Sequence, residues 1–141
     1  MPRKRGSASP PFVVVVEDDD AVGEMYRLGL EASGFDVAVY GDGSALFRSL
    51  DRDIPDVIVL DWQLGGILTG GDIFKNLRLD DRTVDVPVFF LSNHDAQVNE
   101  QDGPVAWLLK SRTTPADLAA RLRLVFGHSG PDSTELRPEP G

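Results

Sequence analysis

The most informative part of this chain is Phe12-Val13-Val14-Val15-Val16, which is followed at once by Glu17-Asp18-Asp19-Asp20. A run of β-branched residues without polar alternation predicts a strand buried on both faces, as in parallel sheets covered by helices. A second such run, Val57-Ile58-Val59-Leu60, is followed by Asp61. Because ligands of open parallel sheets bind beyond the carboxyl ends of the strands, we expect both carboxylate groups to meet in one crevice.

The expected gathering of carboxylates indicates a metal site. Oxygen-rich sites favour Mg²⁺, Mn²⁺ or Ca²⁺, and carboxylates do not crowd together without a cation. Asp61 directly follows four aliphatic residues, where a carboxylate without a role would be costly. For Asp19 and Asp20 we favour another interpretation, in which they begin a helix and offset its macrodipole.

Length and composition indicate one globular domain. The chain has 141 residues, and its hydrophobic content of 41% is ordinary for such a domain. The absence of cysteine excludes disulfides and thiolate metal sites and is consistent with a cytoplasmic protein. A net charge of −9 argues against direct contact with nucleic acid. No apolar run approaches the roughly 18 residues of a membrane span, and the basic start lacks the apolar core of a signal peptide.

Strand and helix patterns alternate between a leader at residues 1–11, predicted to be flexible, and a tail at residues 128–141, predicted to be disordered. The predicted strands are Phe12–Val16, Phe35–Tyr40, Asp56–Leu60, Val86–Leu91 and Val105–Leu109. The predicted helices are Ala21–Ser33, Ser44–Leu50, Gly71–Leu79 and Pro115–Phe126. The alternation predicts an α/β domain over residues 12–127, with a doubly wound, five-stranded parallel sheet.

Five polar residues at the ends of four predicted strands match a known pattern. They are Glu17 and Asp18 after the first strand, Asp61 after the third, Ser92 after the fourth and Lys110 after the fifth. With this set in this order, residues 12–126 resemble the receiver domains of bacterial two-component response regulators. The resemblance implies a flavodoxin-like (βα)5 fold. Its fourth helix would be short or irregular, because residues 94–103 have few apolar anchors.

The resemblance also implies the chemistry of the site. Asp61 would be the nucleophile and phosphoacceptor, and Lys110 would neutralise one phosphoryl oxygen. The Ser92 hydroxyl would donate a hydrogen bond to another phosphoryl oxygen. Ser92 and Trp107 would then form the switch that responds to phosphorylation.

A metal ion completes the implied site. The resemblance gives Mg²⁺, with Mn²⁺ as a substitute, bound by Asp18, Asp61 and the backbone carbonyl of Gln63. Glu17 would hold a metal-bound water and keep the cluster electronegative.

Three features depart from the pattern of the family. Lys110 is followed by Ser111, where the family typically has a proline after a cis peptide bond. The peptide bond between Lys110 and Ser111 is therefore either cis or trans. The span from Ser92 to Lys110 is shorter than usual by about one helical turn. The glycine-rich stretch Leu64–Gly71 is longer than usual, and we reject nucleotide binding because it lacks a Gly-Lys-Ser/Thr ending.

The main hypothesis is a stand-alone receiver domain. It would take its phosphoryl group from a histidine kinase or a histidine phosphotransfer protein, and would catalyse only its own phosphorylation and dephosphorylation. The signal would pass to a downstream protein by contact, since no output domain follows Phe126 unless the chain is a fragment. A homodimer also fits the resemblance, because relatives use the face near the shortened span for dimerising or for contacting targets.

Two other classes of function stay open. The missing proline and the shortened span favour a phosphorylation-independent interaction module on the same fold, whereas the complete acidic set argues against it. A phosphatase like the haloacid dehalogenases is less favoured, because Gln63 occupies the position of their second aspartate. Labelling by acetyl phosphate distinguishes a receiver domain from the phosphorylation-independent module. Steady turnover of a phosphate ester would support a phosphatase.

Overall fold

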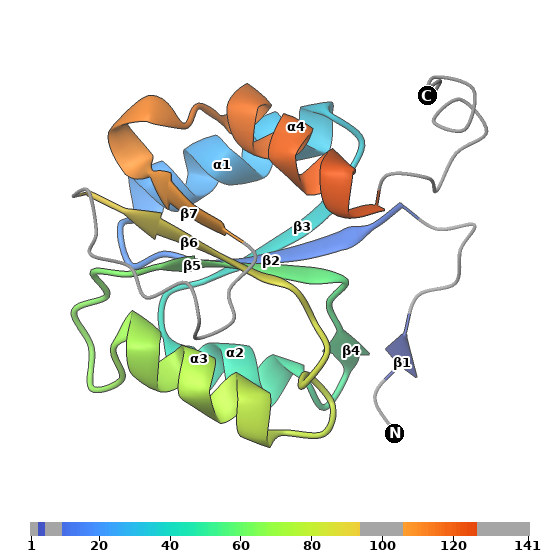
Figure 1. Cartoon of the computed structure of the whole chain (residues 1–141), viewed down its shortest axis with the longest axis vertical. Helices are drawn as coiled ribbons and strands as arrows, with labels where there is room; N and C mark the ends of the chain where they lie inside the picture. The colour runs from blue at the N-terminus through green and yellow to red at the C-terminus, as the bar shows by residue number, and fades with distance from the viewer. Residues whose placement is uncertain (1–2, 5–9, 94–105, 127–141) are drawn as a thin grey trace.

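The computed structural model describes residues 3–4, 10–93 and 106–126, and its centre is a five-stranded parallel sheet (Figure 1). The strands lie in the order β3-β2-β5-β6-β7. Their bounds are β2 (Phe12–Val16), β3 (Asp36–Tyr40), β5 (Val57–Asp61), β6 (Val88–Ser92) and β7 (Ala106–Leu109). The chain reverses its direction of winding between β2 and β5, so the topological switch point of the sheet lies between these two strands.

Helices cover both faces of the sheet (Figure 1). One face is covered by α1 (Asp20–Ala32) and α4 (Pro115–Phe126), and the other by α2 (Gly43–Ser49) and α3 (Gly70–Leu79). The predicted doubly wound, flavodoxin-like α/β sheet is therefore confirmed. The segment for which a short or irregular helix is predicted, residues 94–103, lies outside the described residues.

The valines of β2 explain why this strand lies at the centre. Successive side chains of a strand point to opposite faces of the sheet. Val13 and Val15 accordingly enter the core beneath α1 and α4, whereas Val14 and Val16 enter the core above α2 and α3. All four side chains are fully buried. An uninterrupted apolar run therefore suits a strand with a hydrophobic core on each side.

Two strands that lie beside the site are shifted from their predicted ranges at both ends. The third predicted strand, Asp56–Leu60, instead runs from Val57 to Asp61, because Asp61 pairs with Leu91 of β6. Asp56 therefore precedes the strand, and its side chain accepts a hydrogen bond from the Phe12 N–H at 2.8 Å.

The fourth predicted strand, Val86–Leu91, instead runs from Val88 to Ser92. Val86 closes a turn by donating its N–H to the Thr83 carbonyl at 3.0 Å. Asp61 and Ser92 are thus the last residues of adjacent strands rather than the first residues after them.

The helix ends follow simple local rules. Asp19 is the N-cap of α1, and its Oδ1 accepts hydrogen bonds from the N–H groups of Ala21 and Val22 at 2.9 and 3.1 Å. Asp20 lies in the first turn, so the helix-start interpretation of Asp19 and Asp20 is confirmed. After α1 the chain turns at Gly34, whose φ of 101° is a conformation that favours glycine.

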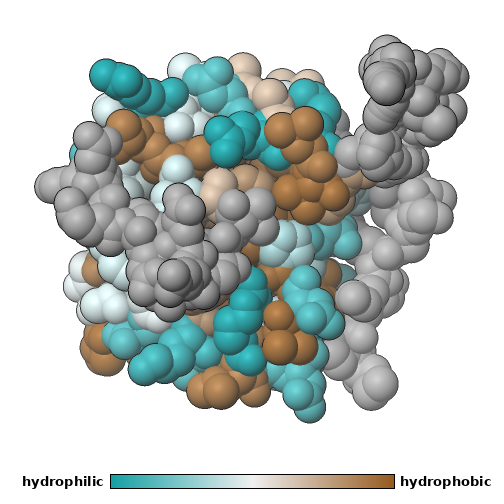
Figure 2. Space-filling view, viewed as in Figure 1, coloured by the Kyte–Doolittle hydropathy of each residue, from teal (hydrophilic) through white to brown (hydrophobic). Residues whose placement is uncertain are grey.

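A second, two-stranded sheet lies beside the main one. It pairs β1 (Arg3–Lys4) with β4 (Asp53–Ile54) in parallel. The first of these strands falls within the predicted leader, whose flexibility stays a prediction, and the predicted tail lies outside the described residues. On the face seen in Figure 2, hydrophobic and hydrophilic residues are interspersed over α3 and α4.

Candidate functional site

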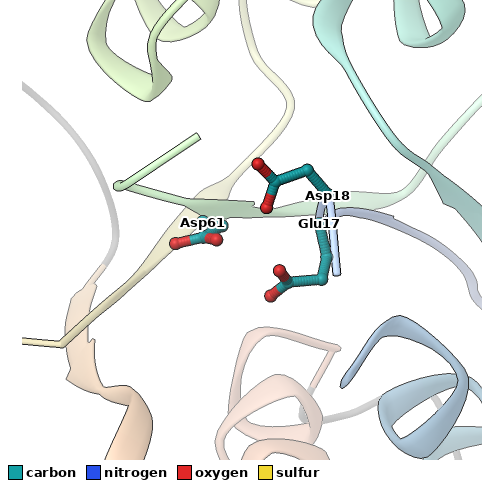
Figure 3. Close-up of side chains that lie close together, drawn as sticks. All are labelled: Glu17, Asp18 and Asp61. Carbon is teal, nitrogen blue, oxygen red and sulfur yellow. The ribbon is translucent and has the colours of Figure 1, made fainter. Parts of the chain in front are cut away.

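The carboxylates that follow β2 and the one that ends β5 meet at the switch point of the sheet. One oxygen from each of Glu17, Asp18 and Asp61 lies within 4.8 Å of the others, and within the described ranges this is the only such group. Figure 3 shows that the three side chains lie close together near the ends of the two adjacent strands. Glu17 is 2% exposed and Asp61 3%, whereas Asp18 is open to solvent. The predicted meeting of the two carboxylate groups is therefore confirmed.

Lys110 supplies the positive charge of the cluster. Its Nζ lies 2.7 Å from Glu17 Oε1 and 3.0 Å from Asp61 Oδ2. Lys110 follows β7 and begins the 3₁₀ helix η2 (Lys110–Arg112). The bond to Ser111 is trans, since the described residues contain no cis peptide. The trans bond is thus the alternative that is present, and the turn brings the ammonium group to Asp61.

Burial and charge act against each other in this cluster. Burial raises the pKa of Glu17, and the opposing contacts with Lys110 and the Asp19 N–H do not cancel that effect. Burial alone would lower the pKa of Lys110, but its contacts with Glu17 and Asp61 outweigh burial and raise this pKa. Lys110 therefore stays charged at neutral pH and neutralises only part of the negative charge around it.

Backbone N–H groups hold each carboxylate in place. The N–H of Asp19 donates to Glu17 Oε2 at 3.0 Å, and the N–H of Gly65 donates to Asp18 Oδ2 at 3.1 Å. The N–H of Gln63 donates to Asp61 Oδ1 at 3.0 Å. The oxygens therefore have fixed positions before any ligand arrives, which is the usual condition for electrostatic catalysis.

Close packing against the end of β5 fixes the chain on either side of Asp61. A Cβ at Gly70 would lie 2.9 Å from the Asp61 carbonyl oxygen and 3.0 Å from Trp62 Cα. The start of α3 can lie against this strand end because residue 70 has no side chain. The N–H of Trp62 donates to the Leu91 carbonyl at 2.8 Å, which ties the same point to β6.

Ser92 ends β6 and is buried beside the site. Gln63 Nε2 donates to Ser92 Oγ at 3.4 Å, and Gln63 Oε1 accepts from the Asn93 N–H at 3.0 Å. The Gln63 side chain thus bridges the ends of β5 and β6. The sequence did not predict this contact of the Gln63 side chain, because no pattern indicates where a loop side chain will point.

Aromatic rings connect the site to β7. Trp107 stacks on Phe90, with ring centroids 4.5 Å apart at 24°, and meets Trp62 edge to face at 4.9 Å. Trp107 packs against the core on the α2 and α3 side of the sheet. The predicted switch residue thus contacts the neighbour of Asp61 directly, which the sequence did not indicate.

A comparison with known protein families matches residues 13–112 to the response regulator receiver domain. The chain belongs to this family. Receiver domains are signalling modules of two-component systems rather than conventional enzymes, and a phosphoacceptor role and contact with histidine kinases are general to them. None of the helices in the described part of this receiver domain is long and apolar enough to cross a membrane.

Individual proteins similar to this chain are transcriptional regulatory proteins. The transcriptional regulatory protein CseB of Streptomyces coelicolor is 38% identical over 129 residues, which cover 87% of this chain and 53% of CseB. The phosphate regulon transcriptional regulatory protein PhoB of Rhizobium meliloti is 30% identical over 133 residues, which cover 90% of this chain and 58% of PhoB. The chain thus spans a little over half the length of these relatives.

Solved structures of the family share the fold. The receiver domain of the Francisella response regulator 1452 is 27% identical, with a TM-score of 0.73. The match covers 85% of this chain and 99% of the Francisella chain.

Receiver domains generally bind Mg²⁺ at an acidic pocket, and the residues of this receiver domain fit such an ion. Three carboxylates offer oxygens within 4.8 Å of one another, whereas Lys110 supplies one positive charge between two of them. The surplus of negative charge suits a small divalent cation. Asp18 is open to solvent, so the ion would keep several waters, as Mg²⁺ does in most proteins.

Proposed function

We propose that this receiver domain accepts a phosphoryl group on Asp61 from a histidine kinase or a histidine phosphotransfer protein, in the cytoplasm, and signals by contact with a downstream protein. The observation that carries the proposal is the position of Lys110. Its Nζ contacts Asp61 Oδ2 at 3.0 Å while also contacting the buried Glu17. A buried carboxylate beside a fixed cation suits a group that gains and loses negatively charged oxygens.

The proposed transfer is a single displacement at phosphorus. An oxygen of the Asp61 carboxylate attacks the phosphorus atom of phosphohistidine, the new O–P bond forms, and the P–N bond breaks. The electron pair stays on the imidazole nitrogen, which takes up a proton. Charge spreads over the three other phosphoryl oxygens, so the work of the protein is positioning and neutralisation. Hydrolysis by water returns the carboxylate and releases phosphate.

Each surrounding residue has a role in this proposal. The Gln63 N–H holds Asp61 Oδ1 at 3.0 Å and so orients the carboxylate, while the Lys110 ammonium neutralises a phosphoryl oxygen. Asp18, Asp61 and the Gln63 backbone carbonyl would hold Mg²⁺, with Glu17 binding through a water. The bound ion would neutralise and orient phosphoryl oxygens, and Mn²⁺ prefers the same ligands.

The signal would begin at Ser92. Its hydroxyl is held near the site by Gln63 at 3.4 Å, and it would donate to a phosphoryl oxygen once Asp61 is modified. That contact exists only in the phosphorylated state, so it shifts the balance between two conformations. Phe90 lies two residues before Ser92 in β6 and stacks on Trp107, which offers a direct path to β7.

The experiment is intact mass spectrometry after incubation with acetyl phosphate and Mg²⁺. We expect one phosphoryl group on the wild type, none on Asp61→Asn and none without metal. Asp19→Asn is the matched control, because Asn also caps a helix, and we expect it to be labelled normally. An unlabelled wild type, with both Mg²⁺ and Mn²⁺, would instead favour the phosphorylation-independent interaction module.

A further inference from the structure

Tyr26 joins the middle of α1 to the segment that carries Lys110. Its ring is 1% exposed, and its Oη donates a hydrogen bond to the Thr113 carbonyl at 2.8 Å. The bond is buried and connects residues 87 positions apart. A buried hydroxyl that reaches a backbone carbonyl over such a separation fixes one segment of chain against another.

Thr113 closes the turn that begins at Lys110. Its N–H donates to the Lys110 carbonyl at 3.5 Å, and its Oγ1 donates to the Leu109 carbonyl at 2.6 Å. Together with the bond from Tyr26, these contacts hold Thr113 from three sides. The backbone of Lys110 therefore depends on where Thr113 is held.

The same stretch of α1 packs tightly against the start of α4. A Cβ at Gly29 would overlap Pro115 Cβ, so α1 and the chain just after Thr113 are in close contact. α1 also begins at Asp20, two residues after Asp18. One helix thus contacts the Lys110 turn at its middle and adjoins the acidic cluster at its start.

We propose that the Tyr26 hydroxyl is a positioning group, which holds the Lys110 turn against α1 so that the Lys110 ammonium lies against Asp61 and Glu17. The inference rests on the proposed function in so far as Lys110 assists phosphorylation. The geometric part, that Tyr26 sets the position of Lys110, stands without it. Burial raises the pKa of Tyr26, so its hydroxyl keeps the proton that it donates at neutral pH.

The test combines Tyr26→Phe with Lys110→Ala in a double-mutant cycle. Phenylalanine keeps the buried ring and removes only the hydroxyl. We expect Tyr26→Phe to slow labelling by acetyl phosphate about fivefold, because the reacting groups must keep their places within about an ångström. In the Lys110→Ala background, itself slowed about 100-fold, we expect the second substitution to change the rate by less than about twofold.

The chain offers a matched control in its other tyrosine. Tyr40 is half-buried in β3, and within the described part of the chain its hydroxyl has no hydrogen-bond partner. We expect Tyr40→Phe to be labelled at the wild-type rate. An equal slowing by Tyr26→Phe with and without Lys110 would mean that Tyr26 only supports the fold, and would overturn the proposal.

A second readout does not depend on phosphorylation. The chain has three lysines, Lys4, Lys75 and Lys110, so ¹³C-labelled lysine gives few side-chain signals to assign. We expect Tyr26→Phe to move the ε-methylene signal of Lys110 and to leave that of Lys75 in place. An unmoved Lys110 signal would overturn the positioning role. A moved signal in a chain that acetyl phosphate never labels would uphold that role while removing the proposed function.

Discussion

The rings of Trp62 and Trp107 meet edge to face, with their centroids 4.9 Å apart and their planes at 65°. Trp62 directly follows Asp61, and Trp107 lies in β7, three residues before Lys110. Both rings also contact Phe90, at 5.1 and 4.5 Å. These are the only tryptophans of the chain, so its fluorescence reports directly on the surroundings of the site.

Metal binding should therefore change the tryptophan fluorescence. We predict a saturable change on titration with Mg²⁺, because an ion held by Asp18 and Asp61 alters the field and packing around Trp62. Asp18→Asn should abolish the change. Asp20→Asn is the control, since Asp20 lies in the first turn of α1 and outside the cluster, and it should respond like the wild type. An equal response from all three proteins would place the ion elsewhere.

Replacing Glu17 should stabilise the fold at neutral pH. Its pKa is raised by burial, so the folded state binds a proton more readily than the unfolded state, and the charged form opposes folding. Urea denaturation without metal should show Glu17→Gln to be more stable than the wild type at pH 7 by on the order of 1 kcal/mol.

The advantage of Glu17→Gln should shrink as the pH falls through the raised pKa, because Glu17 then becomes neutral in the wild type. An advantage that grows on acidification would contradict this account of Glu17. Asp81→Asn is a suitable control, since Asp81 is exposed to solvent and lies outside the cluster.

Removing the charge of Lys110 should have the opposite effect on stability. Lys110→Met leaves Glu17 and Asp61 buried together without their shared cation. We expect a loss of about 2 kcal/mol in the free energy of unfolding, measured by urea denaturation in the presence of a chelator.

Combining Glu17→Gln with Lys110→Met should restore part of the loss, because the two residues are in contact and their effects are not additive. Strict additivity in the double variant would show that the two charges are not coupled. Lys75→Met is the matched control, since Lys75 is exposed on α3.

The close approach of α3 to the end of β5 predicts a cost for a methyl group at residue 70. Gly70→Ala should lower the free energy of unfolding by about 1–3 kcal/mol, because its Cβ would meet backbone atoms that cannot rotate away. Gly66→Ala, in the loop before α3, is the control, since a Cβ there would meet nothing within 4 Å. Thermal unfolding of both variants decides the matter, and equal midpoints would refute the packing argument.

The sequence predicted the sheet and the gathering of charge because both follow from strand patterns. Val13 to Val16 could only suit a strand buried on two faces, and the parallel arrangement then brought Asp18 and Asp61 to one edge. The strand ends at Asp61 and Ser92 were missed by one residue, because pairing with the neighbouring strand decides where a ladder stops.

Other features depend on tertiary contacts that no local pattern records. The Gln63 side chain reaches Ser92 and Asn93 only because the loop after β5 turns towards β6. Tyr26 occupies an apolar position of α1. The helical spacing of apolar residues predicts that Tyr26 is buried, but not that its hydroxyl donates to the Thr113 carbonyl. The sequence also left open whether the peptide bond between Lys110 and Ser111 is cis or trans. The structure has a trans bond there, within the turn that Thr113 closes.

The most direct test of the central claim is to locate the phosphoryl group. Borohydride reduces an acyl phosphate to a primary alcohol, so reduction after labelling with acetyl phosphate and Mg²⁺, followed by peptide mapping, marks the modified carboxylate. We predict the alcohol at position 61 alone. An alcohol at Glu17, Asp18 or Asp19, or a labelled chain with no reduced carboxylate, would contradict the assignment of Asp61 as phosphoacceptor.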